Sequence, residues 1–433
     1  MSNLNKEIQA SYPIWIATDE YTKIDYGAIT TIAYSFASVN GDGSLYKDSG
    51  YNPSDLIAYA HARGVKVILS FQQRTTNDID VLLSNPANQI VLINNLINEM
   101  TTYNFDGVEN DLEWANTINT IIGGPNKPLL TAFQINLYNT FKAKNANYHM
   151  VVALPSHDWN DIWDISTIKD YTDFMLIMGY DFYGSWSSIA GPNAPIDLDN
   201  ISDHSIRKSI QYYESLVPKN KLLLGTPWYG YEFATVSNAR LATRSTNGSV
   251  TGMDYKDYIN VVNNYTIYRD SVWKTPWYTR QIGGQWYQGH YDDVTSLGIK
   301  YDLVNSEGIA GIGIWNVGCG ADRSELWQLI RKKFVSIPVI CSIKVTSPLA
   351  GVIYKVRKSR IIRWTSTGNV GTNVNIQLLR SGIIVKTIST DTANDGSFSW
   401  IVPSVSRGND YQIKITSKTN NLCSGISGKF TIK

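Results

Sequence analysis

Eight short apolar segments, rich in β-branched and aromatic residues, alternate with longer segments of helical periodicity over the first 334 of 433 residues. This alternation is typical of repeated strand–helix units that build a parallel sheet. Eight such units predict an α/β fold, a closed (β/α)8 TIM barrel, whose active site forms at the carboxyl ends of the strands. We expect the strands at residues 13–17, 31–37, 66–71, 107–113, 149–154, 174–180, 221–226 and 308–316.

Two regions depart from the alternation. The segment 232–305 is too long for one strand-to-helix connection, and its Trp, Tyr and Gly content predicts a small insertion subdomain on the barrel rim. After Phe334 the helical periodicity ends, and short alternating runs are separated by turn signals such as Asn394-Asp-Gly396. We therefore expect a barrel over residues 1–334 and a separate C-terminal β-sandwich over residues 339–433.

The formal net charge of +1 conceals a difference between these two regions. From Pro338 onward there are 13 basic and 3 acidic residues, which leaves 25 basic and 34 acidic residues upstream. The acidic barrel region argues against nucleic acid as the main ligand. The basic C-terminal region favours adhesion to an anionic polymer or cell-wall surface, with a solvated basic face that has no ligand as the alternative.

The cysteine and hydropathy patterns bear on metal sites, transmembrane helices and the cell compartment. Cys319, Cys341 and Cys423 fit neither a disulfide framework nor a spaced zinc motif, so we expect no metal; a Cys341–Cys423 bridge and two free thiols are both open. No segment has the 18 apolar residues that a transmembrane helix needs. The first residues lack the basic and apolar regions of a signal peptide, so they do not determine the compartment.

Three acidic residues, Glu109, Asp111 and Glu113, alternate along one expected strand. Side chains two residues apart on a strand point to the same face, which in a barrel is the interior. Asp and Glu are rarely buried there without a function, and the apolar residues between these three argue against the alternative of an acidic surface loop. The pattern therefore indicates a catalytic site.

Coupling between these carboxyl groups suits acid–base chemistry. Neighbouring members have Cα atoms roughly 6.8 Å apart. They cannot all ionise easily, so at least one pKa should rise towards neutral pH. Glu113 lies nearest the barrel mouth and is the expected general acid, while Asp111 behind it can hold a proton or orient a substrate group.

The same segment resembles the Asp-Gly-x-Asp-x-Asp-x-Glu signature of glycoside hydrolase family 18, the chitinases and their relatives. The segment 232–305 is similar to the α+β insertion of that family. Within the family, Pro-Trp228-Tyr-Gly-Tyr231 and Ile314-Trp-Asn316 are most similar to the di-N-acetylchitobiase branch. Other strand segments that match in order are Tyr34-Ser-Phe36, Ser70, Met178-Gly-Tyr180-Asp181, Gly225-Thr-Pro-Trp228-Tyr-Gly and Gly311-Ile-Gly-Ile-Trp315.

The resemblance implies retaining, substrate-assisted hydrolysis of β-1,4-linked N-acetylglucosamine in chitin or chito-oligosaccharides, with no cofactor. It implies that Glu113 protonates the glycosidic oxygen, Asp111 binds the acetamido N–H, and Tyr180 donates to the acetamido oxygen. Four aromatic residues follow strands, where each suits either stacking on a sugar ring or a core position: Trp114, Trp186, Trp228 and Tyr229. The full set of expected substrate-binding residues is Glu109, Met178, Asp181, Trp315, Ser70, Phe36, Trp114, Trp228 and Tyr229.

Departures from the family pattern keep two alternatives open. Glu109 stands where the family has Asp, Asn110 replaces an apolar residue, and Gln72-Gln73 replaces a favoured Gly-Gly pair. A chitin-binding lectin with weak catalysis is one alternative. An endo-β-N-acetylglucosaminidase that acts on N-glycans is the other.

The C-terminal region resembles the immunoglobulin-like, Ser/Thr-rich module of Kre9/Knh1-type yeast cell-wall proteins. The resemblance rests on segments such as Ile362-Arg-Trp364, Asn394-Asp-Gly-Ser-Phe-Ser-Trp400 and Tyr411-Gln-Ile-Lys-Ile415. This module commonly accompanies surface or wall-associated proteins, which implies a secreted or surface-associated protein. We expect the whole protein to be a monomer.

Overall fold

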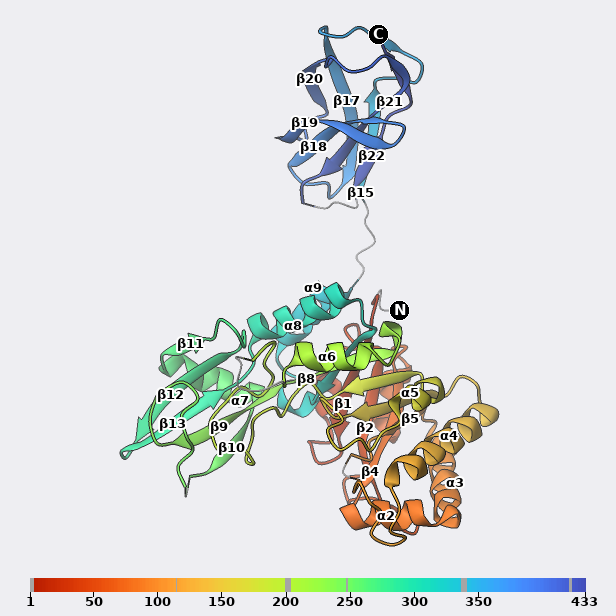
Figure 1. The fold of residues 1–433 in the computed structure, drawn as a ribbon, viewed down its shortest axis with the longest axis vertical. Helices are drawn as coiled ribbons and strands as arrows, with labels where there is room; N and C mark the ends of the chain where they lie inside the picture. The colour runs from red at the N-terminus through yellow and green to blue at the C-terminus, as the bar shows by residue number, and fades with distance from the viewer. Residues whose placement is uncertain (1–3, 114, 199–203, 247, 336–340, 420–422) are drawn as a thin grey trace. The chain divides into compact units, whose positions relative to one another are not determined.

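The protein forms two separate compact units (Figure 1). The computed structural model describes residues 4–113, 115–198, 204–246, 248–335, 341–419 and 423–433. The first unit spans Met1–Val335 and the second spans Ser336–Lys433.

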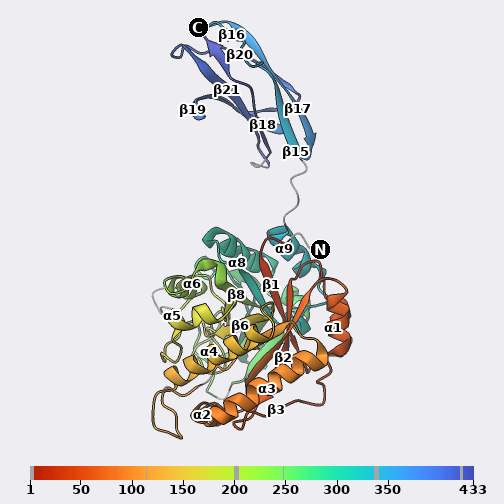
Figure 2. The same ribbon diagram turned by 90° about the vertical axis from the view of Figure 1, so that its right-hand side faces the viewer.

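Eight parallel strands form a closed barrel in the first unit (Figures 1 and 2). They are β1 (Glu7–Pro13), β2 (Thr31–Val39), β4 (Lys66–Gln73), β5 (Gly107–Asn110), β6 (His149–Leu154), β7 (Phe174–Ile177), β8 (Leu222–Pro227) and β14 (Gly311–Trp315). Their order is β1-β14-β8-β7-β6-β5-β4-β2, and pairing of β1 with β2 closes the ring. A short strand, β3 (Leu45–Tyr46), pairs antiparallel with β2. The predicted TIM barrel is confirmed.

Two strand boundaries differ from the sequence prediction in ways that affect the site. β1 lies at Glu7–Pro13 and not at 13–17, because the buried polar residues Gln9 and Ser11 interrupt the apolar run that marks a strand in the sequence. β5 ends at Asn110, so Asp111 and Glu113 lie in the irregular segment that follows the strand. The boundaries of the strands predicted at 174–180 and 308–316 also move inward, to β7 and β14.

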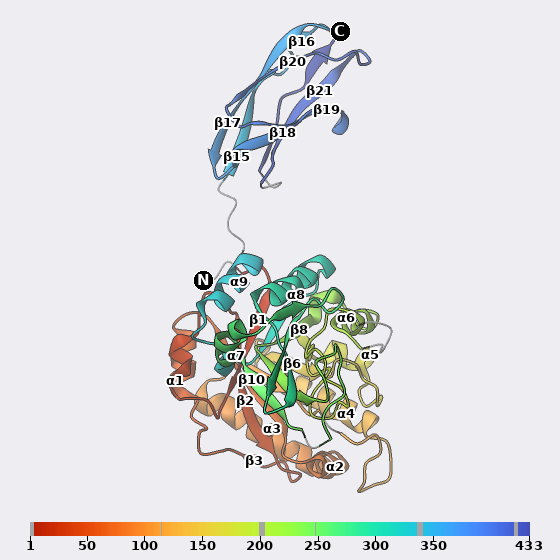
Figure 3. The ribbon, with the colours of Figure 1, turned by 90° about the vertical axis from the view of Figure 1, so that its left-hand side faces the viewer.

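Helices cover the outside of the barrel (Figures 2 and 3). They are α1 (Ser54–His61), α2 (Thr76–Ser84), α3 (Pro86–Tyr103), α4 (Asn126–Lys144), α5 (Ile165–Ile168), α6 (Ile206–Glu214), α8 (Val294–Glu307) and α9 (Ser324–Phe334). The start of α3 follows from local sequence. The Asn85 side chain accepts a hydrogen bond from the backbone N–H of Ala87, and Pro86 occupies the first turn. In the described part of the chain, no helix is long and apolar enough to cross a membrane.

An antiparallel sheet projects from the barrel after β8 (Figure 1). It has the order β10-β9-β13-β12-β11 and carries one helix. Its elements are β9 (Tyr229–Thr235), β10 (Val250–Asp254), α7 (Tyr255–Val261), β11 (Ile267–Arg269), β12 (Pro276–Ile282) and β13 (Gln285–His290). The sequence placed this insertion at 232–305, whereas α8 packs against α9, β8 and β14 and is a barrel helix. Sequence periodicity alone does not tell which sheet a helix packs on.

The second unit is a β-sandwich, as predicted. Its strands are β15 (Cys341–Ser347), β16 (Ile353–Tyr354), β17 (Ser359–Gly368), β18 (Asn373–Arg380), β19 (Ile383–Ala393), β20 (Ser397–Ile401), β21 (Gly408–Ser417), β22 (Ser424–Ile426) and β23 (Phe430–Ile432). One sheet has the order β15-β17-β20, and the other has the order β16-β23-β21-β18-β19 with β22 paired to β21. Trp364, Trp400 and Ile413 belong to its separate hydrophobic core.

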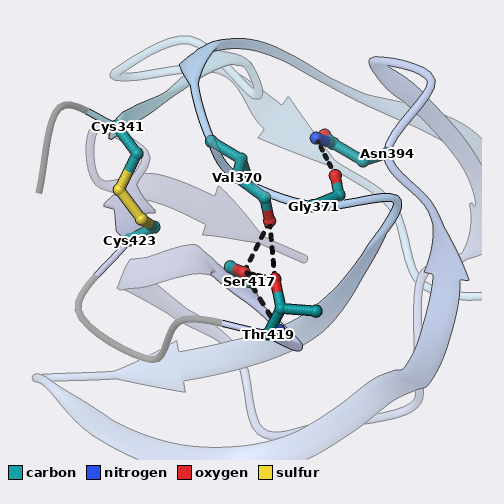
Figure 4. The surroundings of a disulfide bond; sticks show 7 residues. All are labelled: Cys341, Val370, Gly371, Asn394, Ser417, Thr419 and Cys423. Carbon is teal, nitrogen blue, oxygen red and sulfur yellow. Dashed lines mark hydrogen bonds between the residues drawn. A yellow bond between two sulfur atoms is a disulfide. The ribbon is translucent and has the colours of Figure 1, made fainter. Parts of the chain in front are cut away.

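A disulfide bond joins Cys341, the first residue of β15, to Cys423 beside β22 (Figure 4). The sequence left this pairing open, because residues 82 positions apart show no local sign of contact. Nearby, the Ser417 hydroxyl donates to the Val370 carbonyl at 2.6 Å and so ties β21 to a neighbouring loop. Cys319, in the barrel unit, is a buried free cysteine.

Replacing Cys341 and Cys423 together by Ser is expected to lower the free energy of unfolding of the sandwich by about 2–4 kcal/mol. The bond closes a long loop, so its removal gives entropy to the unfolded chain. Calorimetry of the double variant, and of the unmodified protein with reductant, should show this loss. It should affect the unfolding transition of the sandwich and not that of the barrel. Cys319→Ser is the matched control, and a sandwich transition that does not respond to reductant would contradict the expectation.

Candidate active site

Three carboxyl groups line one cavity at the carboxyl ends of the barrel strands. Glu109 belongs to β5, and Asp111 and Glu113 lie in the irregular segment that follows it. The cavity has a volume of about 230 Å³. Nearly every strand contributes to its wall, which is otherwise lined by Ser11, Phe36, Gln72, Ala153, Met178, Tyr180, Asp181 and Trp315.

A second cavity of about 370 Å³ adjoins the first. Its other lining residues include Pro155, Ser156 and Trp186. The two cavities share their remaining lining residues, Glu113, Met178, Tyr180 and Asp181. The Glu113 carboxyl group therefore lies between two spaces that can hold adjacent parts of a ligand.

Burial and mutual charge raise the pKa of the two outer carboxyl groups. Burial, together with the charges of Asp181 and Glu109, raises the pKa of Glu113 to about 7, and a hydrogen bond with Asp111 opposes the rise. The pKa of Asp111 is raised well above its usual range, mainly by burial and then by the charges of Glu113 and Glu109. The raised pKa favours the protonated form of Asp111, which can donate a hydrogen bond to Glu113.

Glu109 lies deeper and has partners on neighbouring strands. The Gln9 side-chain amide on β1 donates to Glu109 Oε1 at 2.6 Å, and Ser70 of β4 stands opposite Glu109 in the sheet register. Burial raises the pKa of Glu109, and the hydrogen bond from Gln9 opposes that rise. Sequence reasoning missed Gln9 because it placed the first strand too late; a polar residue inside an otherwise apolar run was the available signal.

Two residues that depart from the family pattern hold the backbone of the segment 110–113. The Gln73 side-chain oxygen accepts the backbone N–H of Glu113 at 3.1 Å. The Asn110 side-chain oxygen accepts the backbone N–H of Leu112 at 3.2 Å, while its amide donates to Gln134 at 2.9 Å. Both departures are therefore accommodated by hydrogen bonds that position Glu113.

Asp181 holds a group of hydroxyls beside the cavity. Tyr229 donates to Asp181 Oδ1 at 2.5 Å, and Tyr231 donates to the same oxygen at 2.9 Å. Burial raises the pKa of Asp181, and these two hydrogen bonds oppose the rise. Burial also raises the pKa of Tyr180 well above its usual value, so this residue keeps its hydroxyl proton as a donor towards the cavity.

Aromatic side chains form an apolar wall. Phe36 and Trp315 stack with ring centroids 5.6 Å apart. Trp15, which the sequence analysis did not select, lies 6.1 Å from Phe36 and 6.4 Å from Trp315, and it is 62% exposed. Trp186 is equally exposed and lines the second cavity. Aromatic faces of this kind pack against the apolar faces of sugar rings.

The structure corrects or limits four of the expected binding residues. Trp228 is completely buried and packs edge-on against Trp327, so it is a core residue and not a sugar-stacking surface. Ser70 is also fully buried behind the cavity wall. Tyr229 contributes through Asp181 and does not line either cavity. Trp114 lies outside the described residues.

This arrangement combines a carboxyl group of raised pKa, a hydroxyl donor and an apolar wall. Glu113 can deliver a proton to an oxygen bound between the two cavities. Asp111 and Tyr180 can orient and stabilise a polar group bound in the inner cavity next to Trp315.

Comparisons with known proteins identify relatives of this chain and structures of the same fold. A 26% identical relative is a probable endochitinase from Caenorhabditis elegans; the match covers 72% of this chain but only 55% of that protein. Human di-N-acetylchitobiase is 24% identical, with 72% of this chain and 83% of that protein covered. The crystal structure of Ostrinia furnacalis Group IV chitinase in complex with allosamidin has the same fold, with a TM-score of 0.66 and 20% identity over 76% of this chain and 98% of that one.

Two family profiles match, one in each unit. The Kre9/KNH-like N-terminal Ig-like domain matches residues 347–432. The profile of the glycosyl hydrolases family 18 matches residues 10–320, which include all three carboxyl residues and the rest of the site. The chain therefore belongs to glycosyl hydrolases family 18.

Proposed function

We propose that this protein hydrolyses β-1,4-linked N-acetylglucosamine chains, in chitin or chito-oligosaccharides, with retention of configuration. The observation that carries this proposal is the position of Glu113. Its carboxyl group has a pKa of about 7, and Glu113 lines both adjoining cavities next to Asp111, whose pKa is also raised. A sugar chain that fills both cavities brings a glycosidic oxygen to the acid.

The residues around Glu113 suit a mechanism in which the substrate supplies the nucleophile. Glu113 donates its proton to the glycosidic oxygen while the sugar's acetamido carbonyl oxygen bonds to the anomeric carbon. Asp111 orients the acetamido N–H, and Tyr180 donates to the acetamido oxygen. After the leaving sugar departs, Glu113 removes a proton from water, which attacks the anomeric carbon and reopens the ring formed by the acetamido group.

The names of the relatives support the substrate class, since they are a probable endochitinase and a di-N-acetylchitobiase. A product profile on chitin hexamer, together with leaving-group release from a chromogenic chitobioside, tests the proposal. Short chito-oligomers are the expected products. Binding of the hexamer without any product would identify a lectin, and release of glycans from an N-glycoprotein with none from the hexamer would identify an endo-β-N-acetylglucosaminidase.

The pH dependence of hydrolysis should report the ionisation of Glu113. The carboxyl group acts as an acid only while protonated, and its pKa is about 7. We therefore expect kcat/KM to fall tenfold per pH unit above about pH 7. Because the charge of Asp181 contributes to the raised pKa of Glu113, Asp181→Asn should move this alkaline limb to lower pH.

A pH–rate measurement on the chitobioside checks both statements. Asp254→Asn is a matched control, because Asp254 does not line either cavity. An alkaline limb that stays in place in Asp181→Asn, or one that rises in pH, would be inconsistent with the assignment of Glu113.

We also infer a secreted or surface-associated location. The Cys341–Cys423 bond supports it, since stable disulfides are typical of proteins in oxidising compartments. The excess of basic residues in the C-terminal unit supports contact with an anionic surface.

A further inference from the structure

Basic residues of the β-sandwich gather at one of its two ends. This end is formed where β16 and β18 finish and where β17 and β21 begin, as the pairings Tyr354↔Ile432, Gly408↔Ile432 and Arg380↔Tyr411 show. Beside the β15-β17-β20 sheet, the Arg357 backbone N–H donates to the Val402 carbonyl, and the Val402 N–H donates to the Lys358 carbonyl, which closes the same end. Cys341 and the disulfide lie at the opposite end, where Cys341 pairs with Gly368.

Seven cationic side chains occupy this end, which we call the cationic end. They belong to two loops and the adjoining strand termini: Lys355, Arg357, Lys358, Arg360, Arg380, Arg407 and Lys433. Five of them are exposed, and Arg360 and Arg380 are partly exposed. The loop 355–358 alone carries three cations within four residues.

Acidic residues do not balance this charge. Among the described residues of the sandwich, Asp410 is the one acid at the cationic end, and it pairs with Arg380 at 3.1 Å. Asp391 and Asp395 lie near the opposite end, where they accept hydrogen bonds from Asn373 and from the backbone of Ser397. The cationic end therefore has a strong local positive potential.

Large aliphatic side chains are exposed at the same end. Ile383, the first residue of β19, is 71% exposed, and Ile401, the last residue of β20, is 69% exposed. Ile353, which begins β16, is 51% exposed. These three residues come from both sheets and flank the cations.

The combination of cations and aliphatic side chains distinguishes between two kinds of anionic partner. A hydrated polyanionic chain would attract the cations but would gain little from isoleucine. An anionic bilayer attracts the cations through its headgroups and also removes the isoleucine side chains from water at the boundary with the acyl chains. The aliphatic residues would otherwise be exposed without compensation.

We propose that the cationic end of the β-sandwich docks on the surface of an anionic phospholipid membrane. The cations contact the headgroups, and Ile353, Ile383 and Ile401 enter the interface. This inference deepens the proposed surface association and is independent of the proposed hydrolysis, since none of these residues belongs to the barrel.

Sedimentation of the full-length protein with vesicles tests the inference. The protein should bind vesicles that contain phosphatidylserine, and it should bind pure phosphatidylcholine vesicles far more weakly. Neutralising Lys355, Arg357 and Lys358 to Gln should weaken partitioning roughly a hundredfold, at about 1 kcal/mol per cation near the surface. Ile383→Ser with Ile401→Ser should weaken it roughly tenfold or more, with the salt dependence unchanged.

A matched control changes the same net charge elsewhere on the sandwich, with Lys344, Lys414 and Lys418 replaced by Gln. Its partitioning should stay close to that of the unmodified protein. Equal weakening by both triple variants would overturn the proposal, because attraction would then follow total charge. Binding to heparin that is as tight as vesicle binding, with no effect of the isoleucine changes on either, would assign the surface to a polyanionic chain instead. Calorimetry of each variant, in which the unfolding transition of the sandwich should be retained, confirms that the sandwich is folded.

Discussion

Replacing Glu113 by Gln is expected to lower kcat on a chromogenic chitobioside roughly a thousandfold, within the range that a general acid contributes. Gln keeps the shape of the side chain and the backbone hydrogen bond that Gln73 accepts from residue 113. It has no proton to give to the leaving oxygen. Steady-state kinetics measures the loss, and calorimetric titration with a chito-oligomer should show that binding persists.

The stability of this variant separates lost chemistry from lost structure. Burial raises the pKa of Glu113, so folding favours its protonated form, and its contribution to stability decreases as the pH rises through about 7. Glu113→Gln removes that ionisation and should be at least as stable as the unmodified protein at pH 8. Retention of unmodified kcat in Glu113→Gln would assign the acid to another residue.

Replacing Lys300 by Met is expected to lower the free energy of unfolding of the barrel by about 3–5 kcal/mol. The Lys300 ammonium on α8 pairs with the Asp292 carboxylate just before that helix, and both side chains are almost completely buried. Burial raises the pKa of Asp292 and lowers that of Lys300, while the pairing opposes both shifts. Removing one partner leaves the other charge buried without compensation.

A double variant tests this explanation. Asp292→Leu combined with Lys300→Met removes both charges, so it should recover much of the stability that Lys300→Met loses. Denaturant unfolding of the full chain measures each value, with Lys333→Met as the control for a partly exposed lysine pair on α9. A loss below 1 kcal/mol in Lys300→Met would contradict the expected cost of the unpaired carboxylate.

The residues that depart from the family pattern have a different meaning once they are placed in three dimensions. In the sequence, the departures at Glu109 and Gln72-Gln73 kept open the alternative of a chitin-binding lectin with weak catalysis. In the structure, Gln73 and Asn110 hold the segment that carries Glu113, and Gln72 lines the inner cavity. Glu109 is similarly accommodated by Gln9. These contacts favour an enzyme over a lectin, and the kinetic experiments above test that choice.

The sequence by itself determined the barrel, the sandwich and the set of carboxyl groups at the mouth. Strand alternation, helix caps such as Asn85-Pro86, and the spacing of Glu109, Asp111 and Glu113 are local patterns, and each is set by neighbouring residues along the chain. The order of the matching strand segments then brought Tyr180, Asp181 and Trp315 into the same site, because parallel strands end at the same face of a barrel.

Contacts between distant residues decided the rest. Because β1 pairs with both β2 and β14, Gln9 is buried and its side chain donates to Glu109. The polar side chain of Gln9 interrupts the apolar pattern, so the sequence did not show this strand. Trp228 packs against Trp327 and is therefore a core residue. The helix α8, which the sequence placed in the insertion, packs against α9 and β14 and therefore belongs to the barrel. The Cys341–Cys423 bond and the cationic end likewise depend on which strands meet in space, and no pattern within a single segment records that information.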